Sequence, residues 1–253
     1  MLLTIDIGNT NLVFGCFEKD KLLFQFRLRT DTERTVDEYS ALFLTLSRQN
    51  YGAELTIDQC IISSVVPSLT GVICSMVQKL IGLDALLVGP GIKTGLSLKV
   101  PNPGSVGADR VVNMVAAKKL FGCPCLVIDF GTATTFEYIN KDGDYEGGVI
   151  CPGPHVSMAS LVRHTAQLPV VDLIWPKHVL GRTTVDQMQV GGVLGYACLV
   201  GGLIEQISKE VGPVSHIVAT GGLGKIFAEH SKSILTYEPS LTLHGLKFIA
   251  EMN

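Results

Sequence analysis

The sequence lacks the features that mark several classes of protein. It has no block of Lys and Arg, its formal net charge is −3 and its pI is near 6.1, so it offers no basic surface for a nucleic acid. The mean hydropathy is +0.36, yet a charge, Pro or Gly interrupts each apolar stretch before it reaches the roughly 20 residues of a spanning helix. We therefore expect neither a nucleic-acid partner nor a membrane segment.

Secretion and disulfide signals are also missing. No charged leader with an A-x-A-like cleavage site precedes the first apolar stretch, because Asp6 interrupts it, so we expect no signal peptide. The seven cysteines are an odd number and include no C-x-x-C pair, which favours reduced core residues. The glycine-rich run 190–204 comes closest to a membrane span, and we interpret it as a buried helix of a cytoplasmic protein.

The first fifteen residues combine an apolar strand with an acid and a glycine turn. Residues 1–7 are typical of a buried strand that carries Asp6 near its end, and Gly8 and Asn9 tolerate the positive φ of a hairpin turn. With Thr10 as a further donor, such a turn can bring backbone N–H groups against a phosphate while Asp6 faces the accompanying metal. The pattern predicts a nucleotide-phosphate loop.

The same pattern occurs again 123 residues later. Residues 125–130 form an apolar strand with Asp129 near its end, and Gly131 and Thr132 follow. One such turn is more often an ordinary hairpin, but two of them half of the 253-residue chain apart indicate a duplication. We expect an α/β protein of two similar halves that share one cleft.

A third segment places charged side chains at the start of a helix. Gly107 permits a tight turn before a helix that runs to Leu120, and Asp109 and Arg110 fall in its first turn. The helix dipole favours an acid there but not a base. Arg110 therefore either makes a surface ion pair or is presented with Asp109 to a substrate.

Two further helix starts carry capping signals. Thr35 with Glu38 three residues later predicts a capping box. Thr183 or Thr184 caps a long helix, and either one can instead reach into the cleft. Near the C-terminus, residues 221–222 follow a strand, where glycines suit either a simple strand-to-helix turn or the flat face of an adenine.

Taken together, these motifs resemble a known family. The residues that carry the resemblance are 6–10, 29–31, 34–39, 107–110, 129–135, 147–148, 152–153, 163–166, 168–169, 181–184 and 219–222. Their order and spacing resemble the acetate kinase, sugar kinase, heat-shock protein 70 and actin superfamily, and within it closely the type III pantothenate kinase family.

The resemblance implies a fold and an activity. The fold would be two duplicated ribonuclease-H-like lobes, each a mixed sheet flanked by helices, with the active-site cleft between them. Residues 1–115 would form the N-terminal lobe and residues 116–253 the C-terminal lobe. The activity would be ATP-dependent phosphorylation of pantothenate to 4'-phosphopantothenate, the first step of coenzyme A biosynthesis, by a homodimer.

The resemblance also implies residue roles. ATP would be bound by Asp6, Ile7, Gly8, Asn9, Thr10, Asn11, Leu12, Val13 and Thr132. Pantothenate would be bound by Gly107, Ala108, Asp109, Arg110 and, across the dimer interface, Thr184. Asp109 would be the catalytic proton acceptor and Asp129 the ligand of a monovalent cation, K⁺ or NH₄⁺. Asp6 would hold the Mg²⁺ of ATP through water.

Three positions differ from the family pattern. Val100 and Pro101 stand where the family often has a tyrosine before the substrate motif, Thr183 replaces a frequent asparagine, and Glu137 replaces a frequent aspartate. None of these differences alters Asp109.

The implied reaction needs few chemical groups. Phosphoryl transfer passes through a loose transition state, so placement and electrostatic stabilisation contribute most of the catalysis. With an ordinary pKa of about 3.9, Asp109 would be a weak base that suffices if it orients the hydroxyl and takes the proton late. Arg110 would counter the charge of the substrate carboxylate or of the moving phosphoryl group.

Three alternatives remain open at this stage. The first is a kinase of the same superfamily that acts on another small alcohol or carboxylate, against which the motif 107–110 favours pantothenate. The second is a non-catalytic ATP-binding regulator, which would have no need to keep Asp109. The third is an actin-like filament former, for which the chain is short.

Overall fold

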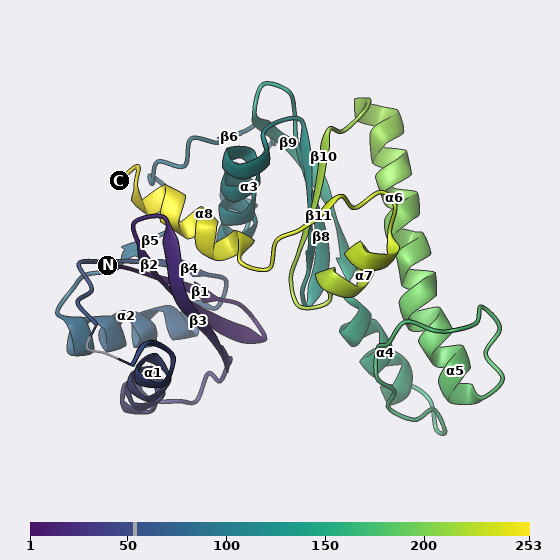
Figure 1. Cartoon of the computed structure of the whole chain (residues 1–253), viewed down its shortest axis with the longest axis horizontal. Helices are drawn as coiled ribbons and strands as arrows, with labels where there is room; N and C mark the ends of the chain where they lie inside the picture. Colours follow the sequence, from purple (N-terminus) through teal and green to yellow (C-terminus); the bar gives the residue numbers. More distant parts are fainter. Residues whose placement is uncertain (53–54) are drawn as a thin grey trace. The chain divides into compact units, whose positions relative to one another are not determined.

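The computed structural model describes residues 1–52 and 55–253, and these form two compact units (Figure 1). The first unit comprises Met1–Leu96, Pro101–Lys119 and Ser240–Asn253, and the second comprises Ser97–Val100 and Leu120–Pro239. This division differs from the predicted one at residue 115 mainly in the C-terminal helix. Leu246 and Ile249 of that helix share a core cluster with Val112 of the first unit, so the chain returns there at its end.

The first unit is built on a five-stranded mixed sheet in the order β3-β2-β1-β4-β5. β1 is antiparallel to β2 and parallel to β4. The strands are β1 (Leu2–Ile7), β2 (Asn11–Glu18), β3 (Lys21–Arg29), β4 (Gln59–Ser64) and β5 (Leu86–Leu87). The helices are α1 (Val36–Tyr51), α2 (Pro67–Ile81), α3 (Ala108–Phe121) and α8 (Leu241–Ala250), with a 3₁₀ turn, η1 (Pro103–Ser105), before α3.

Alternation along β1 sends its side chains to opposite faces of this sheet. Leu3, Ile5 and Ile7 are completely buried in a cluster with side chains of α1 and α2. Thr4 and Asp6 therefore point to the other face, where α3 and α8 pack. The register of the strand thus places Asp6 on the same face as the helix that carries Asp109.

The predicted capping box at the start of α1 is confirmed. The Glu38 N–H donates to Thr35 Oγ1 (3.3 Å), and the Thr35 N–H donates to a Glu38 carboxylate oxygen (2.8 Å). These bonds satisfy two backbone donors that have no partner within the helix.

The second unit repeats the arrangement of the first. Its six-stranded sheet has the order β11-β10-β7-β8-β9-β6, in which β7 is antiparallel to β8 and parallel to β10. Read from β9 to β11, the order and strand directions match those from β3 to β5, so the predicted duplication is confirmed. The strands are β6 (Ser97–Leu98), β7 (Cys125–Phe130), β8 (Ala133–Ile139), β9 (Asp144–Pro152), β10 (His216–Thr220) and β11 (Thr236–Tyr237). The helices are α4 (Pro154–Arg163), α5 (Thr184–Gln189), α6 (Gly195–Val211) and α7 (Gly224–His230).

α5 and α6 form one helical rod through a π-helical turn, η2 (Val190–Leu194) (Figure 1). The prediction that this region is a buried helix is wrong for most of its surface. Only a stripe that includes Val193, Tyr196, Val200 and Ile204 is buried, because this spacing places one side of the helix against the sheet. The span Thr184–Val211 is long and apolar enough to cross a membrane by length and composition, with 22% of its most apolar window buried. One such helix is weak evidence of a membrane span.

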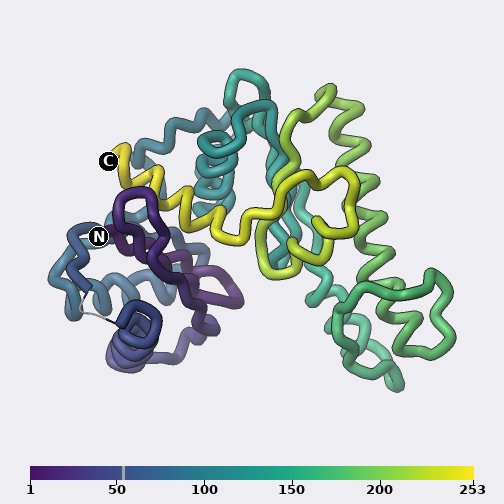
Figure 2. Tube along the Cα trace, viewed as in Figure 1, coloured from purple at the N-terminus to yellow at the C-terminus, as the bar shows by residue number. Residues whose placement is uncertain are grey.

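The connection between α4 and α5 folds back along α5, as the trace in Figure 2 shows. Gln187 Nε2 donates to Gly181 O (3.3 Å), and Gln189 Nε2 donates to Asp172 O (3.2 Å). These contacts fix the segment that leads into the start of α5.

Candidate functional site

The first phosphate loop lies between β1 and β2. Asp6 is the fifth residue of β1 and pairs with Val13 of β2 and Ser63 of β4. The side chains of Asn9 and Thr10 are exposed, whereas Ile7 and Leu12 are completely buried. Of the predicted ATP-binding residues, Ile7 and Leu12 therefore present only backbone to a ligand.

The predicted positive φ in this loop is wrong, because neither Gly8 nor Asn9 adopts it. The loop is instead closed by hydrogen bonds. The Gly8 N–H donates to Asn11 O (3.0 Å), and a Cβ on Gly8 would lie 3.1 Å from the same oxygen. Glycine therefore suits this position because the backbone of Asn11 comes close to it, and not because the chain adopts a left-handed conformation there.

Thr30, at the end of β3, holds the loop from outside. Its hydroxyl donates to Gly8 O (2.6 Å), and its N–H donates to Thr10 O (2.9 Å). The sequence placed Thr30 in a family motif but gave it no function. Its contact with the loop comes from the pairing of β3 with β2, which local patterns do not reveal.

The predicted substrate motif begins α3. The Gly107 carbonyl accepts from the Val111 N–H (3.1 Å), and Asp109 Oδ1 accepts from the Arg110 N–H (2.8 Å). A Cβ on Gly107 would lie 2.6 Å from Asp109 Oδ1, so the carboxylate folds back over the glycine. Gly107 thus leaves room for the acid that follows it.

Burial raises the pKa of Asp109, and the N–H and charge of Arg110 oppose this only in part. The expectation of an ordinary pKa is therefore wrong. The cause is the packing of α3 against the sheet, which removes water from the carboxylate. A carboxylate with a raised pKa is a stronger base.

The structure brings the first loop and the substrate motif together within the first unit. The Val65 N–H donates to Ile7 O (3.0 Å), and Val65 Cγ1 lies 3.7 Å from the position of a Cβ on Gly107. Val65 therefore touches both the end of the Asp6 strand and the turn before Asp109. The first phosphate loop and the substrate motif, about a hundred residues apart in sequence, therefore lie close together where β1 and β4 end.

The second phosphate loop lies in the second unit, between β7 and β8. Asp129 is the fifth residue of β7, and the exposed Thr132 follows it. The Gly131 N–H donates to Ala133 O (3.0 Å), and the Gly153 N–H donates to Thr132 O (2.9 Å). The start of α4 therefore packs directly on this loop.

Gly221 packs on Asp129 from the neighbouring strand. It has a φ of 85°, and a Cβ there would lie 2.5 Å from Asp129 Oδ1 and 2.7 Å from Phe130 N. Only glycine combines this conformation with this proximity. The turn 221–222 thus adjoins the acid predicted to bind a cation, in addition to preceding α7.

Thr184 is exposed at the first position of α5. Thr183 is the N-cap, because its hydroxyl accepts from the Asp186 N–H (3.2 Å) and its N–H donates to Asp186 Oδ2 (3.0 Å). The hydroxyl of Thr183 also lowers the pKa of Asp186. Thr184 is therefore the threonine that remains available for a ligand.

The donor sets at the two acids fit the implied cations. Each acid supplies a carboxylate, that of Asp129 lies against the backbone of Gly221, and hard cations prefer oxygen ligands. Mg²⁺ with a nucleotide commonly needs only one or two carboxylates, with water and phosphate completing its shell. Within residues 1–52 and 55–253, no three His, Cys, Asp or Glu side chains are grouped to hold a metal ion.

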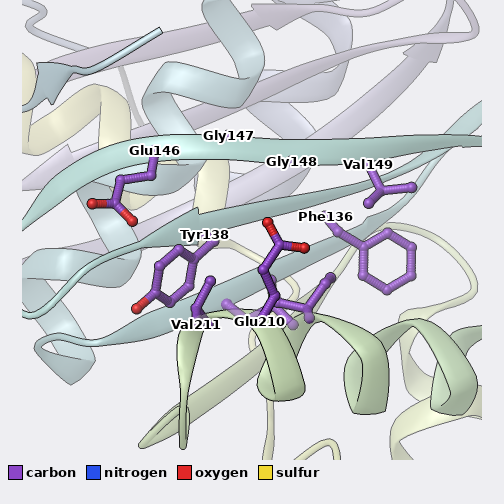
Figure 3. Close-up of a pocket in the computed structure, with 10 residues that line it drawn as sticks. Phe136, Tyr138, Glu146, Gly147, Gly148, Val149, Glu210 and Val211 are labelled. Atoms are coloured by element: carbon purple, nitrogen blue, oxygen red, sulfur yellow. The ribbon is translucent and has the colours of Figure 1, made fainter.

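A separate pocket of about 270 Å³ lies between the β8–β9 hairpin and the end of α6 (Figure 3). Glu146 and Glu210 face it from opposite walls, with Tyr138 beside Glu146. Burial and the charge of Glu146 raise the pKa of Tyr138. None of the predicted site residues lines this pocket.

Solved structures share the fold over nearly the whole chain. One is a Campylobacter jejuni protein assigned to the Baf family of transcriptional activators (20% identity, TM-score 0.59, covering 98% of this chain and 97% of that one). Another is the activator of the 2-hydroxyisocaproyl-CoA dehydratase from Clostridium difficile with bound ADPNP (10% identity, TM-score 0.56, covering 99% and 95%). These likenesses show the fold, in which two duplicated sheets each carry an acid near the end of the first strand.

Comparison with sequence relatives identifies the family. Residues 2–206 match the model of the family described as type III pantothenate kinase. A type III pantothenate kinase from Geobacter sulfurreducens is 44% identical over 256 residues, covering 100% of this chain and 99% of that protein. Other bacterial proteins of the same name match the whole chain at 41–44% identity. The chain belongs to the type III pantothenate kinase family.

Proposed function

We propose that this protein transfers the terminal phosphoryl group of ATP to the primary hydroxyl of pantothenate in the cytoplasm. The product is 4'-phosphopantothenate, and the reaction is the first step of coenzyme A biosynthesis. The observation that carries the proposal is the full-length family match, combined with an intact substrate motif, residues 107–110, beside the first phosphate loop.

Asp109 is the proton acceptor in this proposal. Its carboxylate is oriented by the Arg110 N–H, and burial raises its pKa. It binds the substrate hydroxyl and takes the proton as the bond to phosphorus forms. Gly107, Ala108 and Arg110 bind pantothenate around it.

The nucleotide is bound by the two glycine loops. Residues 6–13 bind the phosphates through backbone N–H groups and the exposed side chains of Asn9 and Thr10, and Thr132 makes a further contact with ATP. Asp6 would hold the Mg²⁺ of ATP. When bound, Mg²⁺ neutralises phosphate charge.

Asp129 binds a monovalent cation, K⁺ or NH₄⁺. Its Oδ1 lies beside the Gly221 turn, where a Cβ would be only 2.5 Å from it. When bound, such a cation would offset the repulsion between this carboxylate and the phosphates of ATP.

The active form is a homodimer in which Thr184 reaches the substrate of the partner subunit. The support is the exposed apolar surface around α5 and α6. Val185 is 41% exposed and Leu199 is 42% exposed, and exposed apolar side chains that gather on one surface mark an interaction site. Sedimentation velocity tests this: a dimer is expected, and a monomer that turns over at the full rate contradicts it.

The function is tested by an assay that couples ADP release to a detectable signal, run with pantothenate and with a panel of other small alcohols and carboxylates. Pantothenate is expected to give by far the highest kcat/KM, and K⁺ to stimulate the rate. A higher kcat/KM for another acceptor would assign the chain a different substrate. ADP release that no acceptor stimulates would contradict the proposed kinase activity.

A further inference from the structure

The peptide group between Pro152 and Gly153 is held on both sides. Its carbonyl accepts a hydrogen bond from the Tyr196 hydroxyl (3.0 Å), and its N–H donates to Thr132 O (2.9 Å). A trans peptide points its C=O and N–H in opposite directions. The two hydrogen bonds therefore fix the rotation of one rigid plane that connects α6 to the second phosphate loop.

Backbone atoms of the second phosphate loop pack closely against this peptide plane. A Cβ on Gly153 would collide with Gly131 O and lie 2.6 Å from Thr132 O. Gly153 is also the N-cap of α4, so a rotation of the peptide moves both the loop and the start of the helix. A shift of this peptide plane would therefore also shift the loop that carries Thr132.

Tyr196 is well placed to hold the plane. It is 8% exposed, and its ring lies 5.6 Å from that of Phe227, which stacks at 4.7 Å on Phe130. Phe130 directly follows Asp129. Tyr196 comes just after the π-helical turn η2, a feature frequent at functional sites because it changes the direction in which the following residues point.

The protonation state of Tyr196 suits a donor. Burial raises the pKa of its hydroxyl, and the neighbouring Thr134 side chain opposes this only in part. The hydroxyl therefore keeps its proton at neutral pH and donates it to Pro152 O. Thr134 is completely buried.

We propose that Tyr196 is a positioning residue for ATP binding, which acts through the Pro152–Gly153 peptide to hold Thr132. The inference rests on the proposed function, in which Thr132 contacts ATP. Tyr196 itself touches neither ATP nor pantothenate in this account. It adds to the nucleotide site a residue that no motif identified.

The test is the variant Y196F, which removes the hydroxyl and keeps the ring. We expect the Kd for ATP with Mg²⁺, measured by calorimetry, to rise roughly five- to tenfold, the range for losing one hydrogen bond. The KM for ATP should rise in parallel, and the KM for pantothenate should stay within about twofold, the scale of an indirect effect. The variant T134V is expected to weaken ATP binding less, and the double variant no more than Y196F alone.

Y145F is the matched control, because Tyr145 is 3% exposed and lies on β9, the strand that ends at Pro152. Its ATP affinity is expected to equal that of the wild type. Wild-type ATP affinity in Y196F, equal weakening for ATP and pantothenate, or the same loss in Y145F would overturn the inference. If Y196F fails to fold by circular dichroism, T134V decides, and unchanged ATP binding in it overturns the inference. A wild type that binds ATP but does not phosphorylate pantothenate would refute the proposed function, while the binding comparison would still test Tyr196.

Discussion

Asp6 and Asp129 occupy equivalent positions in the two sheets. Each is the fifth residue of a six-residue strand that pairs antiparallel with its hairpin partner. Each also stands opposite a hydroxyl residue of a parallel strand, Ser63 for Asp6 and Thr220 for Asp129. The surroundings then differ, because the turn before Asp109 adjoins the end of the Asp6 strand whereas Gly221 adjoins Asp129. The same local structure therefore serves two roles in the proposed reaction.

The substitution D109N should remove the proton acceptor without disturbing the fold. We expect turnover to fall roughly 10²-fold or more, the usual scale for a positioned acid–base group, with ATP binding retained. The wild-type kcat/KM should decline as the pH falls through the pKa of Asp109, which burial raises. Steady-state kinetics across the pH range check both points, and near-normal turnover in D109N would remove Asp109 from its role.

The same substitution should not lower stability. Because the folded pKa of Asp109 is raised, the folded state holds its proton more tightly, and stability falls as the pH rises from the ordinary pKa through the raised one. At pH 7 the ionised carboxylate therefore destabilises the fold, so D109N should melt at the wild-type temperature or above it. The difference should shrink below pH of about 4. Differential scanning calorimetry measures this, and a clear drop in Tm at pH 7 would contradict the burial argument.

The substitution T30V should loosen the first phosphate loop. It removes the hydroxyl that donates to Gly8 O while keeping the β-branched shape. We expect the KM for ATP to rise about fivefold, consistent with one lost hydrogen bond, with little change in the KM for pantothenate. T45V is the control, since the exposed Thr45 hydroxyl donates to Ala41 O within α1. An ATP KM equal to that of T45V would show that Thr30 does not shape the loop.

The substitution G153A should displace the second loop. The new Cβ would meet backbone oxygens of Gly131 and Thr132, which can yield only if the loop moves. ATP affinity should fall at least tenfold and Tm should drop, as for a substitution that forces backbone shifts. G71A is the control, because nothing lies within 4 Å of that site in α2 and alanine there should stabilise the helix by about 0.5–1 kcal/mol. ATP titrations measure the affinity of both variants. Equal ATP affinities of G153A and G71A would argue against close packing of Gly153 on the second loop.

Replacing K⁺ by Na⁺ should reduce activity, because Asp129 is proposed to select the larger ion. In D129N the rate should be low and should no longer depend on which ion is present. Rates measured at constant ionic strength separate this effect from general screening. A wild type that is indifferent to the monovalent ion would count against the role of Asp129.

Local patterns predicted much of the fold. The two apolar strands with Asp6 and Asp129 near their ends are confirmed, as are the capping box at Thr35 and the start of a helix beside Thr183. These features depend on residues close in sequence, so periodicity and capping rules capture them.

What the sequence missed depends on contacts distant in the chain. The hydrogen bond from Thr30 to Gly8, the approach of Gly153 to Thr132, and the return of α8 to the first sheet all follow from tertiary packing. The sequence did not predict that much of α6 is exposed, because its run of glycine and apolar residues shows no polar side that would mark the exposed face. The raised pKa of Asp109 was missed because burial is not visible in a motif.

The most direct measurement of the central claim is the product itself. The purified protein is incubated with ATP, Mg²⁺, K⁺ and pantothenate, and 4'-phosphopantothenate and ADP are quantified by mass spectrometry. The account predicts equal amounts of the two products from the wild type and almost none from D109N. ADP formed without 4'-phosphopantothenate, or product formed equally well by D109N, would contradict it.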